Sequence, residues 1–91
     1  MQRMKIEYDP IKAASNLNKH GVAFEEAQSA VEDQSSIVIE NPDAQGEARF
    51  ILIGMSSKLR LLTVVYSLPA EDTIRLISAR LSTSKEEKYY A

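Results

Sequence analysis

Two apolar runs, Ala48–Met55 (ARFILIGM) and Leu59–Ser67 (LRLLTVVYS), decide the fold class of this chain. Each has the length of a strand and is rich in aliphatic and β-branched residues. Only the short polar turn Ser56-Ser57-Lys58 separates them. A connection this short joins antiparallel neighbours, because parallel strands need a crossover of a dozen or more residues. The two runs therefore predict a hairpin within an antiparallel sheet.

Three further strands are predicted around this hairpin, at Met4–Tyr8, Ser36–Glu40 and Asp72–Arg80. Turn residues separate the later strands, at Asn41-Pro42-Asp43 with Gly46 and at Leu68-Pro69-Ala70-Glu71. Near-continuous apolar runs such as Phe50–Ile53 favour a sheet that is covered on both faces. Two helices can cover one face. The other face needs the last helix, a second copy of the chain or a partner.

Helix signals flank these strands. Asp9-Pro10 opens a helix that ends at Lys19-His20-Gly21, where cations meet the negative end of the helix dipole and glycine can take the left-handed conformation. Its apolar stripe is predicted to comprise Ile11, Ala14, Leu17 and Asn18. A second helix is predicted at Phe24–Val31, and a short last helix carries a capping box formed by Ser84 and Glu87. The resulting order, β-α-α-β-β-β-β-α, predicts one α+β domain over residues 1–91.

Composition limits the chemistry. With 91 residues, 44% hydrophobic, 26% charged and a net charge of −2, the chain fits one soluble domain. No apolar run approaches the roughly 20 residues of a membrane helix, and the N-terminus does not resemble a signal peptide, so a cytoplasmic location is expected. The absence of cysteine excludes disulfides and thiolate catalysis. With a single histidine, a metal site would have to be built from carboxylates, and no cofactor is expected.

Charge is distributed unevenly along the chain. Residues 21–47 contain seven acidic side chains and no Lys or Arg, whereas residues 48–91 contain seven basic and four acidic side chains. An acidic lobe beside a basic one permits an anionic ligand on one side and a basic partner on the other. The alternative interpretation is an ordinary solvated surface.

The familiar catalytic motifs are missing: there is no Gly-rich phosphate loop, no Gly-x-Ser-x-Gly elbow and no HExxH. What stands out is a set of arginines that interrupt or bound hydrophobic strands, namely Arg49, Arg60, Arg75 and Arg80. An arginine in such a place needs an anion or a carboxylate partner. Strand alternation puts Arg75 and Arg80 on opposite faces, unless the strand bends or ends near Arg80.

Structural interpretations compete for each candidate. Arg49 and Arg75 could pair with Glu40 or Glu47 on neighbouring strands. His20 could serve only as the cationic end of the first helix. The tyrosines at 66, 89 and 90 could be packing residues, and Lys85 and Lys88 could be simply solvated.

Taken together, the motifs resemble the BrnT family of ribonuclease toxins from type II toxin–antitoxin systems. The specific segments are Lys19-His20-Gly21-Val22-x-Phe24-Glu25-Glu26-Ala27 and Arg75-x-Ile77-Ser78-Ala79-Arg80. Weaker matches extend the resemblance over nearly the whole chain, at Tyr8-Asp9-Pro10, Lys12, Asn16, Asp33, Glu47, Arg49, Ile53-Gly54, Leu62, Val64-Val65-Tyr66, Glu86 and Tyr89 or Tyr90.

The resemblance implies a fold like that of the RelE ribonucleases and an RNA-cleaving toxin that inhibits translation and growth. It also implies a ribbon-helix-helix antitoxin like BrnA, which represses the shared operon and alone contacts operator DNA. A homodimer or a toxin–antitoxin heterotetramer would fit. Within this picture His20, Arg49 and Arg80 are candidate catalytic residues, and Lys19, Arg60, Arg75 and Tyr90 are candidates for binding RNA or phosphate. Metal-independent cleavage needs a proton acceptor, for which histidine is the natural choice near neutral pH.

This chain departs from the family pattern in three places. Leu81-Ser82-Thr83-Ser84 stands where further basic residues usually follow Arg80, Tyr8 stands where tryptophan is common, and Ala23 replaces a hydroxyl residue that caps the second helix. The thinner basic patch keeps a second hypothesis open, an antitoxin-binding subunit with weak or no catalysis. A plain nucleic-acid-binding module is a third hypothesis, but no helix-turn-helix or RNA-stacking motif supports it.

Overall fold

The computed structural model describes residues 4–41 and 49–90, with only the backbone at Glu40 and Asn41. Its elements follow the predicted order: β1 (Lys5–Glu7), α1 (Pro10–His20), α2 (Phe24–Val31), β2 (Ile37–Asn41), β3 (Arg49–Met55), β4 (Leu61–Ala70), β5 (Thr73–Leu81), α3 (Ser84–Glu87) and the 3₁₀ turn η1 (Lys88–Tyr90). The turn predicted after Asn41 lies outside the described residues. No described helix combines the length and the apolar character needed to cross a membrane.

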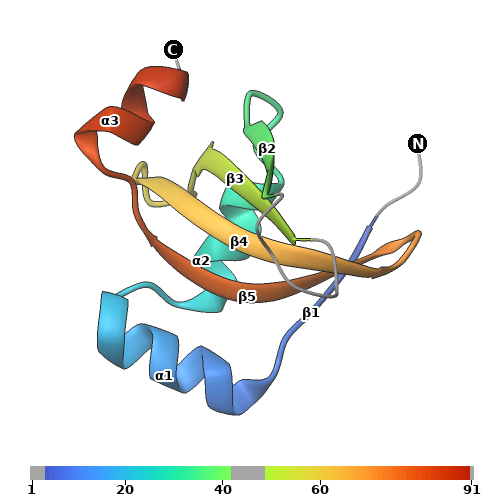
Figure 1. Cartoon of the computed structure of the whole chain (residues 1–91). Helices are drawn as coiled ribbons and strands as arrows, with labels where there is room; N and C mark the ends of the chain where they lie inside the picture. The colour runs from blue at the N-terminus through green and yellow to red at the C-terminus, as the bar shows by residue number, and fades with distance from the viewer. Residues whose placement is uncertain (1–3, 42–48, 91) are drawn as a thin grey trace.

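The strands form one five-stranded sheet in the order β1-β5-β4-β3-β2. Four strands make the predicted antiparallel meander, but β1 pairs with β5 in parallel, so the expectation of a purely antiparallel sheet was wrong. Parallel pairing is available to β1 because two helices and three strands separate it from β5 in the chain. Figure 1 shows β1 crossing at the edge of the sheet, next to β5.

The connection predicted at Leu68–Glu71 is shorter than expected. Strand β4 continues to Ala70, and only Glu71 and Asp72 turn the chain. Pro69 is tolerated within β4 because the pairing with β5 is irregular between Ser67 and Ala70. At the other end β4 begins two residues later than predicted, because Leu59 takes the left-handed conformation (φ 59°) in the preceding turn.

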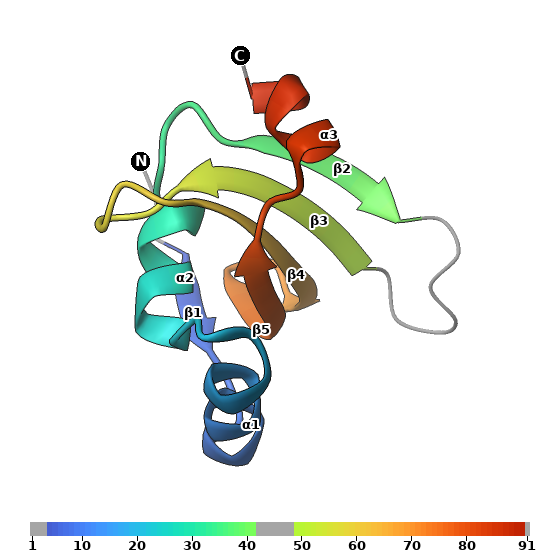
Figure 2. The same ribbon diagram turned by 90° about the vertical axis from the view of Figure 1, so that its left-hand side faces the viewer.

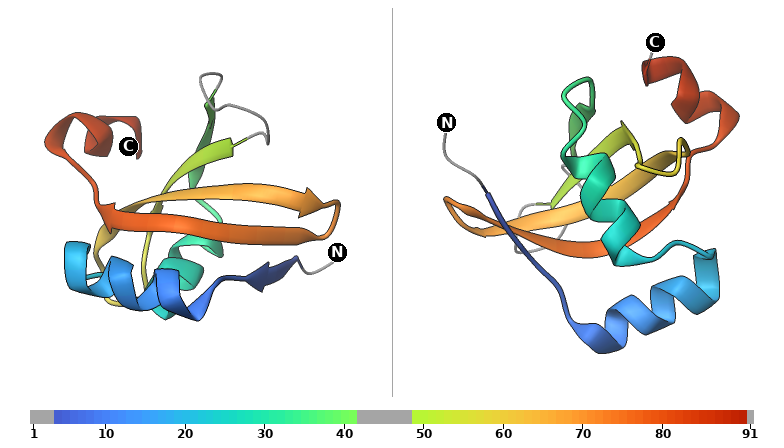
Figure 3. Two further views of the ribbon diagram at one scale, coloured as in Figure 1. Left: turned by 60° about the horizontal axis from the view of Figure 1, so that its bottom comes forward. Right: turned by 180° about the vertical axis from the view of Figure 1, so that it is seen from behind.

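Helix α2 packs across the sheet and supplies much of the core (Figures 2 and 3). Phe24, Ala27 and Ala30 on one face of α2 are fully buried and belong to the same cluster as Leu52 and Val64 of the sheet. The i, i+3, i+6 spacing of these residues puts them on one face of the helix, and the helix has the predicted bounds. Ala23 precedes the helix without a side-chain cap, as its methyl group requires.

Helix α1 docks differently from the prediction. Its expected apolar stripe was wrong, because Ile11 is 79% exposed and Leu17 is 52% exposed. The buried residue is Asn16, at 6% exposure. Its side-chain NH₂ donates to the carbonyls of Val22 and Ala79, both at 2.9 Å, and its Oδ1 accepts from the Ala79 N–H at 3.0 Å. The helix is therefore attached by an amide to the backbone of β5.

The physical reason lies in the length of β1. This strand pairs only with Thr73–Arg75, so it does not reach Ala79 further along β5. An unpaired backbone N–H and C=O in the interior would be costly, and an asparagine amide offers the donor and acceptor that a neighbouring strand would have supplied. Helix α1 runs along this edge in the direction of β5 (Figure 3, left).

The sheet face opposite α1 and α2 is called the open face below, with Ile39, Ile51 and Val65 near its centre. The last helix covers only one end of this face. There, Ile53 is 1% exposed, whereas Ile39 is 40% exposed. The predicted capping box is one residue out of place: Thr83 and Glu86 form it, because the helix begins at Ser84 and its third residue is therefore Glu86.

We predict that Asn16→Ala lowers the free energy of unfolding by about 2–3 kcal/mol, because it leaves buried backbone groups of β5 without partners. Urea denaturation followed by far-ultraviolet circular dichroism measures this. The control is Asn18→Ala, which removes an exposed amide from the same helix and should change stability by less than about 0.5 kcal/mol. Equal effects of the two substitutions would contradict the role of Asn16.

A second prediction concerns the contact between α2 and β3 at Gly54. A Cβ on Gly54 would collide with the carbonyl oxygen of Ala30, which is backbone and cannot rotate away. Gly54→Ala should therefore cost about 2–3 kcal/mol. Gly21→Ala is the comparison: it meets no atom within 4 Å but must adopt φ +69°, at a cost of about 1 kcal/mol. Thermal unfolding in which Gly21→Ala is the more damaging variant would contradict this account.

Candidate functional site

A β-bulge places Arg75 and Arg80 on the same face of the sheet. Between β4 and β5, Val65 pairs with Ser78 while the next residue, Tyr66, pairs with Leu76. Ile77 is thus an extra residue that reverses the alternation along β5. The partners of Arg80, Ser78 and Arg75 on β4 are Thr63, Val65 and Ser67, which alternate regularly along one face. Simple alternation along the strand predicted that Arg75 and Arg80 lie on opposite faces of the sheet. That prediction was wrong because of the bulge.

Arg49 lies in the same row of the sheet as Arg75. It pairs with Ser67 across β3 and β4, and Ser67 pairs in turn with Arg75. Arg49 is exposed and forms no ion pair with the described residues. Ser67, between the two arginines, is 1% exposed, and its hydroxyl has no hydrogen-bond partner among the described residues. The open face therefore carries three arginines, at positions 49, 75 and 80.

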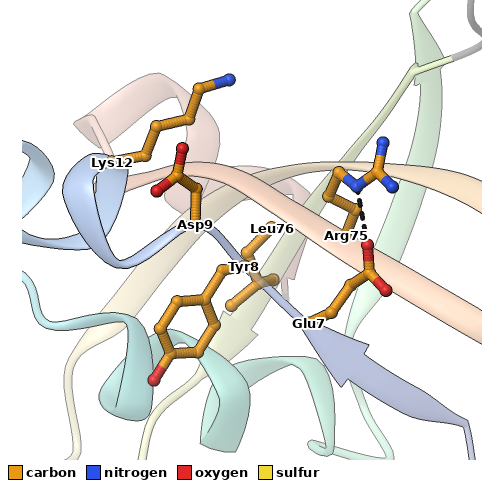
Figure 4. Close-up of a pocket in the computed structure, with 6 residues that line it drawn as sticks. All are labelled: Glu7, Tyr8, Asp9, Lys12, Arg75 and Leu76. Carbon is orange, nitrogen blue, oxygen red and sulfur yellow. Dashed lines mark hydrogen bonds and ion pairs between the residues drawn. The ribbon is translucent and has the colours of Figure 1, made fainter.

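Arg75 is held by Glu7 on the neighbouring strand β1. Its Nε donates to Glu7 Oε2 at 2.8 Å, as the dashed line in Figure 4 marks. Both side chains are about half exposed, so this pair contributes little to stability. The alternative partners considered from the sequence, Glu47 and the side chain of Glu40, lie outside the described residues.

Arg80 forms a two-pronged ion pair with Glu86 of α3. The terminal nitrogens Nη1 and Nη2 each donate to a different Glu86 oxygen at 2.8 Å. Glu86 also accepts from the Thr63 hydroxyl at 3.0 Å and from the Thr83 N–H at 2.8 Å. The guanidinium, ahead of these other donors, lowers the pKa of Glu86 from 4.5 to about 2, although burial opposes this. Glu86 occupies the fork that a phosphate group would bind in the same geometry.

Lys19 and His20 lie beside this face rather than on it. They end α1 and line a hollow of about 270 Å³ between α1 and β5, together with Ser78. Ser78 of this hollow stands two residues before Arg80 on β5. Arg49, Arg75 and Arg80, called the arginine cluster below, share the open face: Arg49 lies in the row of Arg75, and Arg80 lies five residues further along β5.

Arg60 does not join this group. Its guanidinium donates to both oxygens of Glu26 on α2, through Nε at 2.9 Å and through Nη2, on the helical side of the sheet. Glu26 is 4% exposed, yet the hydrogen bonds from Arg60 lower its pKa against the effect of burial. This pair joins α2 to the turn before β4, so Arg60 has a structural role.

The Tyr90 hydroxyl is also hydrogen-bonded to another side chain of this protein. It donates to Asp33, which accepts further hydrogen bonds from the backbone of Met55 and Ser35. The Tyr90 hydroxyl lowers the pKa of Asp33, and the carboxylate in turn raises the pKa of Tyr90. These bonds fasten η1 to the end of β3. Tyr66 packs as expected, stacked on Phe50 at 5.4 Å between ring centroids.

Sequence reasoning missed three residues of this region. Ser67 is a small polar residue in an apolar strand, and only the pairing register reveals that it lies between Arg49 and Arg75. Ser78 was recognised as part of a family segment and as sharing a face with Arg80, but not as lining a hollow beside α1. Glu86 was recognised for its match to the family but not as the partner of Arg80. Its spacing from Thr83 is a capping-box signal that could have placed it at the start of α3. Among the described residues, no three His, Cys, Asp or Glu side chains gather as a metal site would require.

The fold is that of a small α+β protein whose open sheet face carries Arg49, Arg75 and Arg80. Residues 8–86 match the family described as "Ribonuclease toxin, BrnT, of type II toxin-antitoxin system". The chain belongs to this BrnT family, and membership of a type II system implies an antitoxin partner.

One solved structure supports the same fold. The chain is similar to the 1.1 Å crystal structure of the Brucella abortus ribonuclease toxin BrnT, with a TM-score of 0.70 and 24% identity. The alignment covers 89% of this chain and 99% of that one. No curated protein matches the chain.

The Arg80–Glu86 pair makes a prediction about pH. Because the pKa of Glu86 falls from 4.5 to about 2 on folding, the pair stabilises the fold above about pH 4.5 and this contribution disappears as the pH falls through 2. Glu86→Gln should therefore lower the free energy of unfolding by about 1–2 kcal/mol at pH 7. The difference between variant and wild type should shrink towards zero near pH 2. Urea titrations at several pH values measure it, and a pH-independent difference would refute the assignment.

Proposed function

We propose that this protein is a metal-independent endoribonuclease whose cleavage of RNA inhibits translation and growth. We also propose that it acts in the cytoplasm and that a BrnA-like ribbon-helix-helix antitoxin neutralises it, within a heterotetramer or around a toxin homodimer. The observation that carries the proposal is the shared face of Arg49, Arg75 and Arg80, with His20 and Lys19 in the hollow beside β5. Family membership supports the substrate class, and the shared face supports the choice of residues.

The proposed reaction is a phosphoryl transfer within the RNA chain. The ribose 2′-oxygen attacks the adjacent phosphorus and loses its proton to a base, while the bond from phosphorus to the 5′-oxygen breaks and that oxygen gains a proton. The products are a 2′,3′-cyclic phosphate and a 5′-hydroxyl. His20 is our candidate for proton transfer, since imidazole can accept and donate near neutral pH. Arg49 and Arg80 are our candidates for stabilising the charge that builds on the phosphate.

A second candidate function is an antitoxin-binding subunit with weak catalysis. The observation that favours it is ion pairing: Arg80 is engaged by Glu86 on two nitrogens, and Arg75 is engaged by Glu7. An RNA phosphate must displace or share these carboxylates before the arginines can act on it. Arg49, exposed and without an ion pair among the described residues, has no such obstacle.

The two functions predict different outcomes for cleavage of naked RNA by purified, antitoxin-free protein in buffer with EDTA. We expect cleavage by the wild type and a loss on the order of 100-fold in rate for Arg49→Ala and for Arg80→Ala. Arg49→Ala is the sharper variant because it breaks no described ion pair and should fold normally. Lys58→Ala, which removes an exposed charge from the turn between β3 and β4, should cleave at the wild-type rate.

Adding ribosomes to the same reaction separates the remaining outcomes. Cleavage that appears only with ribosomes, and is lost in Arg49→Ala, would support a ribonuclease that needs the ribosome. A folded protein that binds its antitoxin but cleaves RNA under neither condition would overturn the enzymatic proposal in favour of the binding subunit.

A further inference from the structure

A groove runs between α1 and the edge of β5. It consists of two adjoining hollows, of about 420 Å³ and about 270 Å³, which share Lys12 in their walls. The larger hollow lies at the start of α1, beside Arg75 (Figure 4), and the smaller one lies at the end of α1, beside Ser78. Because α1 runs in the direction of β5, the groove points towards Arg80 near the end of that strand (Figure 3, left).

The groove exists because α1 borders β5 where a strand would otherwise lie. Strand β1 leaves β5 after Arg75, and Asn16 then fastens the helix to Ala79. A helix is wider than a strand, and α1 contacts the sheet through the buried Asn16 and the partly buried Ala13, while the residues beside them line the two hollows.

Cations are spaced along this channel on one face of the helix. Lys12, Ser15 and Lys19 follow the i, i+3, i+7 pattern, which sets the two lysines about 10 Å apart along the helix axis. Neither lysine forms an ion pair within the described part of the chain. None of the described residues that line the smaller hollow is a carboxylate.

The two acids of the larger hollow are already engaged. Asp9 accepts from the N–H of Ile11 and caps α1, and Glu7 is paired with Arg75. The channel thus offers ammonium groups at two points, with the hydroxyls of Ser15 and Ser78 in the wall of the smaller hollow and His20 at the end of α1, away from Arg75. An extended chain of phosphodiesters presents negative charges at regular intervals and hydroxyls between them, which is the complementary pattern.

We propose that this groove binds the backbone of single-stranded RNA and leads it to the arginine cluster. Lys12 and Lys19 contact successive or alternate phosphates, and the serine hydroxyls donate to phosphate or ribose oxygens. The inference rests on the proposed ribonuclease function and adds the path that the substrate takes outside the reacting phosphate. Contacts of this kind fix register and affinity without reading the base sequence.

Equilibrium binding to an uncleavable probe tests this path apart from catalysis. The probe is a single-stranded RNA of about 12 nucleotides carrying 2′-O-methyl groups throughout, with affinity followed by fluorescence anisotropy between about 50 and 200 mM salt. The variant is Lys12→Ala combined with Lys19→Ala. The matched control is Lys58→Glu, which lowers the net charge by the same amount at an exposed turn.

We expect the double variant to bind the probe about 10-fold or more weakly at low salt, and the slope of log affinity against log salt to flatten by about 1.4, as two lost phosphate contacts require. Lys58→Glu should keep the wild-type slope. If both variants weaken binding equally, or the double variant keeps the wild-type slope, the groove is not the path, even though Arg49-dependent cleavage would still uphold the ribonuclease. If the wild type neither binds the probe nor cleaves RNA, both proposals fail.

Discussion

The hydrogen bonds between Asn16 and Ala79 are the constraint on which the arrangement of this molecule depends. They substitute for the strand that β5 lacks beyond Arg75, and they hold α1 along that edge although Ile11 and Leu17 of the helix point to solvent. With the Asn16 amide and the partly buried Ala13 holding the helix, its other positions can carry polar and basic residues. The attachment that satisfies the backbone of β5 thereby also brings Lys19 and His20 to the hollow beside β5.

The bulge at Ile77 is the second device that shapes this region. In a regular strand, Arg75 and Arg80 would point to opposite faces of the sheet. One of them would then lie beneath the helices, where an unpaired guanidinium is unfavourable. One extra residue turns both towards the open face, next to Arg49 on β3. Glu7 pairs with Arg75, and Glu86 pairs with Arg80. These carboxylates reduce the electrostatic repulsion among the arginines when no anionic ligand is bound.

The C-terminal segment links this chemistry to the stability of the fold. Glu86 caps α3, accepts from Thr63 and pairs with Arg80, while Tyr90 fastens η1 to Asp33. Any phosphate that takes the Arg80 fork therefore competes with a carboxylate that also orders the last helix. Glu86 thus connects Arg80 of β5 to the start of α3.

The order of the helices and strands could be predicted from the sequence because their signals are local. The cap at Asp9, the stop at Gly21 and the strand runs each follow from neighbours within a few residues, and the family motifs added the class of protein. Three features could be seen only in the tertiary structure. Strand β1 pairs with β5 in parallel, and Asn16 rather than Ile11 is the buried residue of α1. Arg60 pairs with Glu26 and lies apart from the arginine cluster. These outcomes depend on which backbone groups and charges meet across the sheet. That is a property of strand register and of partners distant in the chain, which local patterns do not encode.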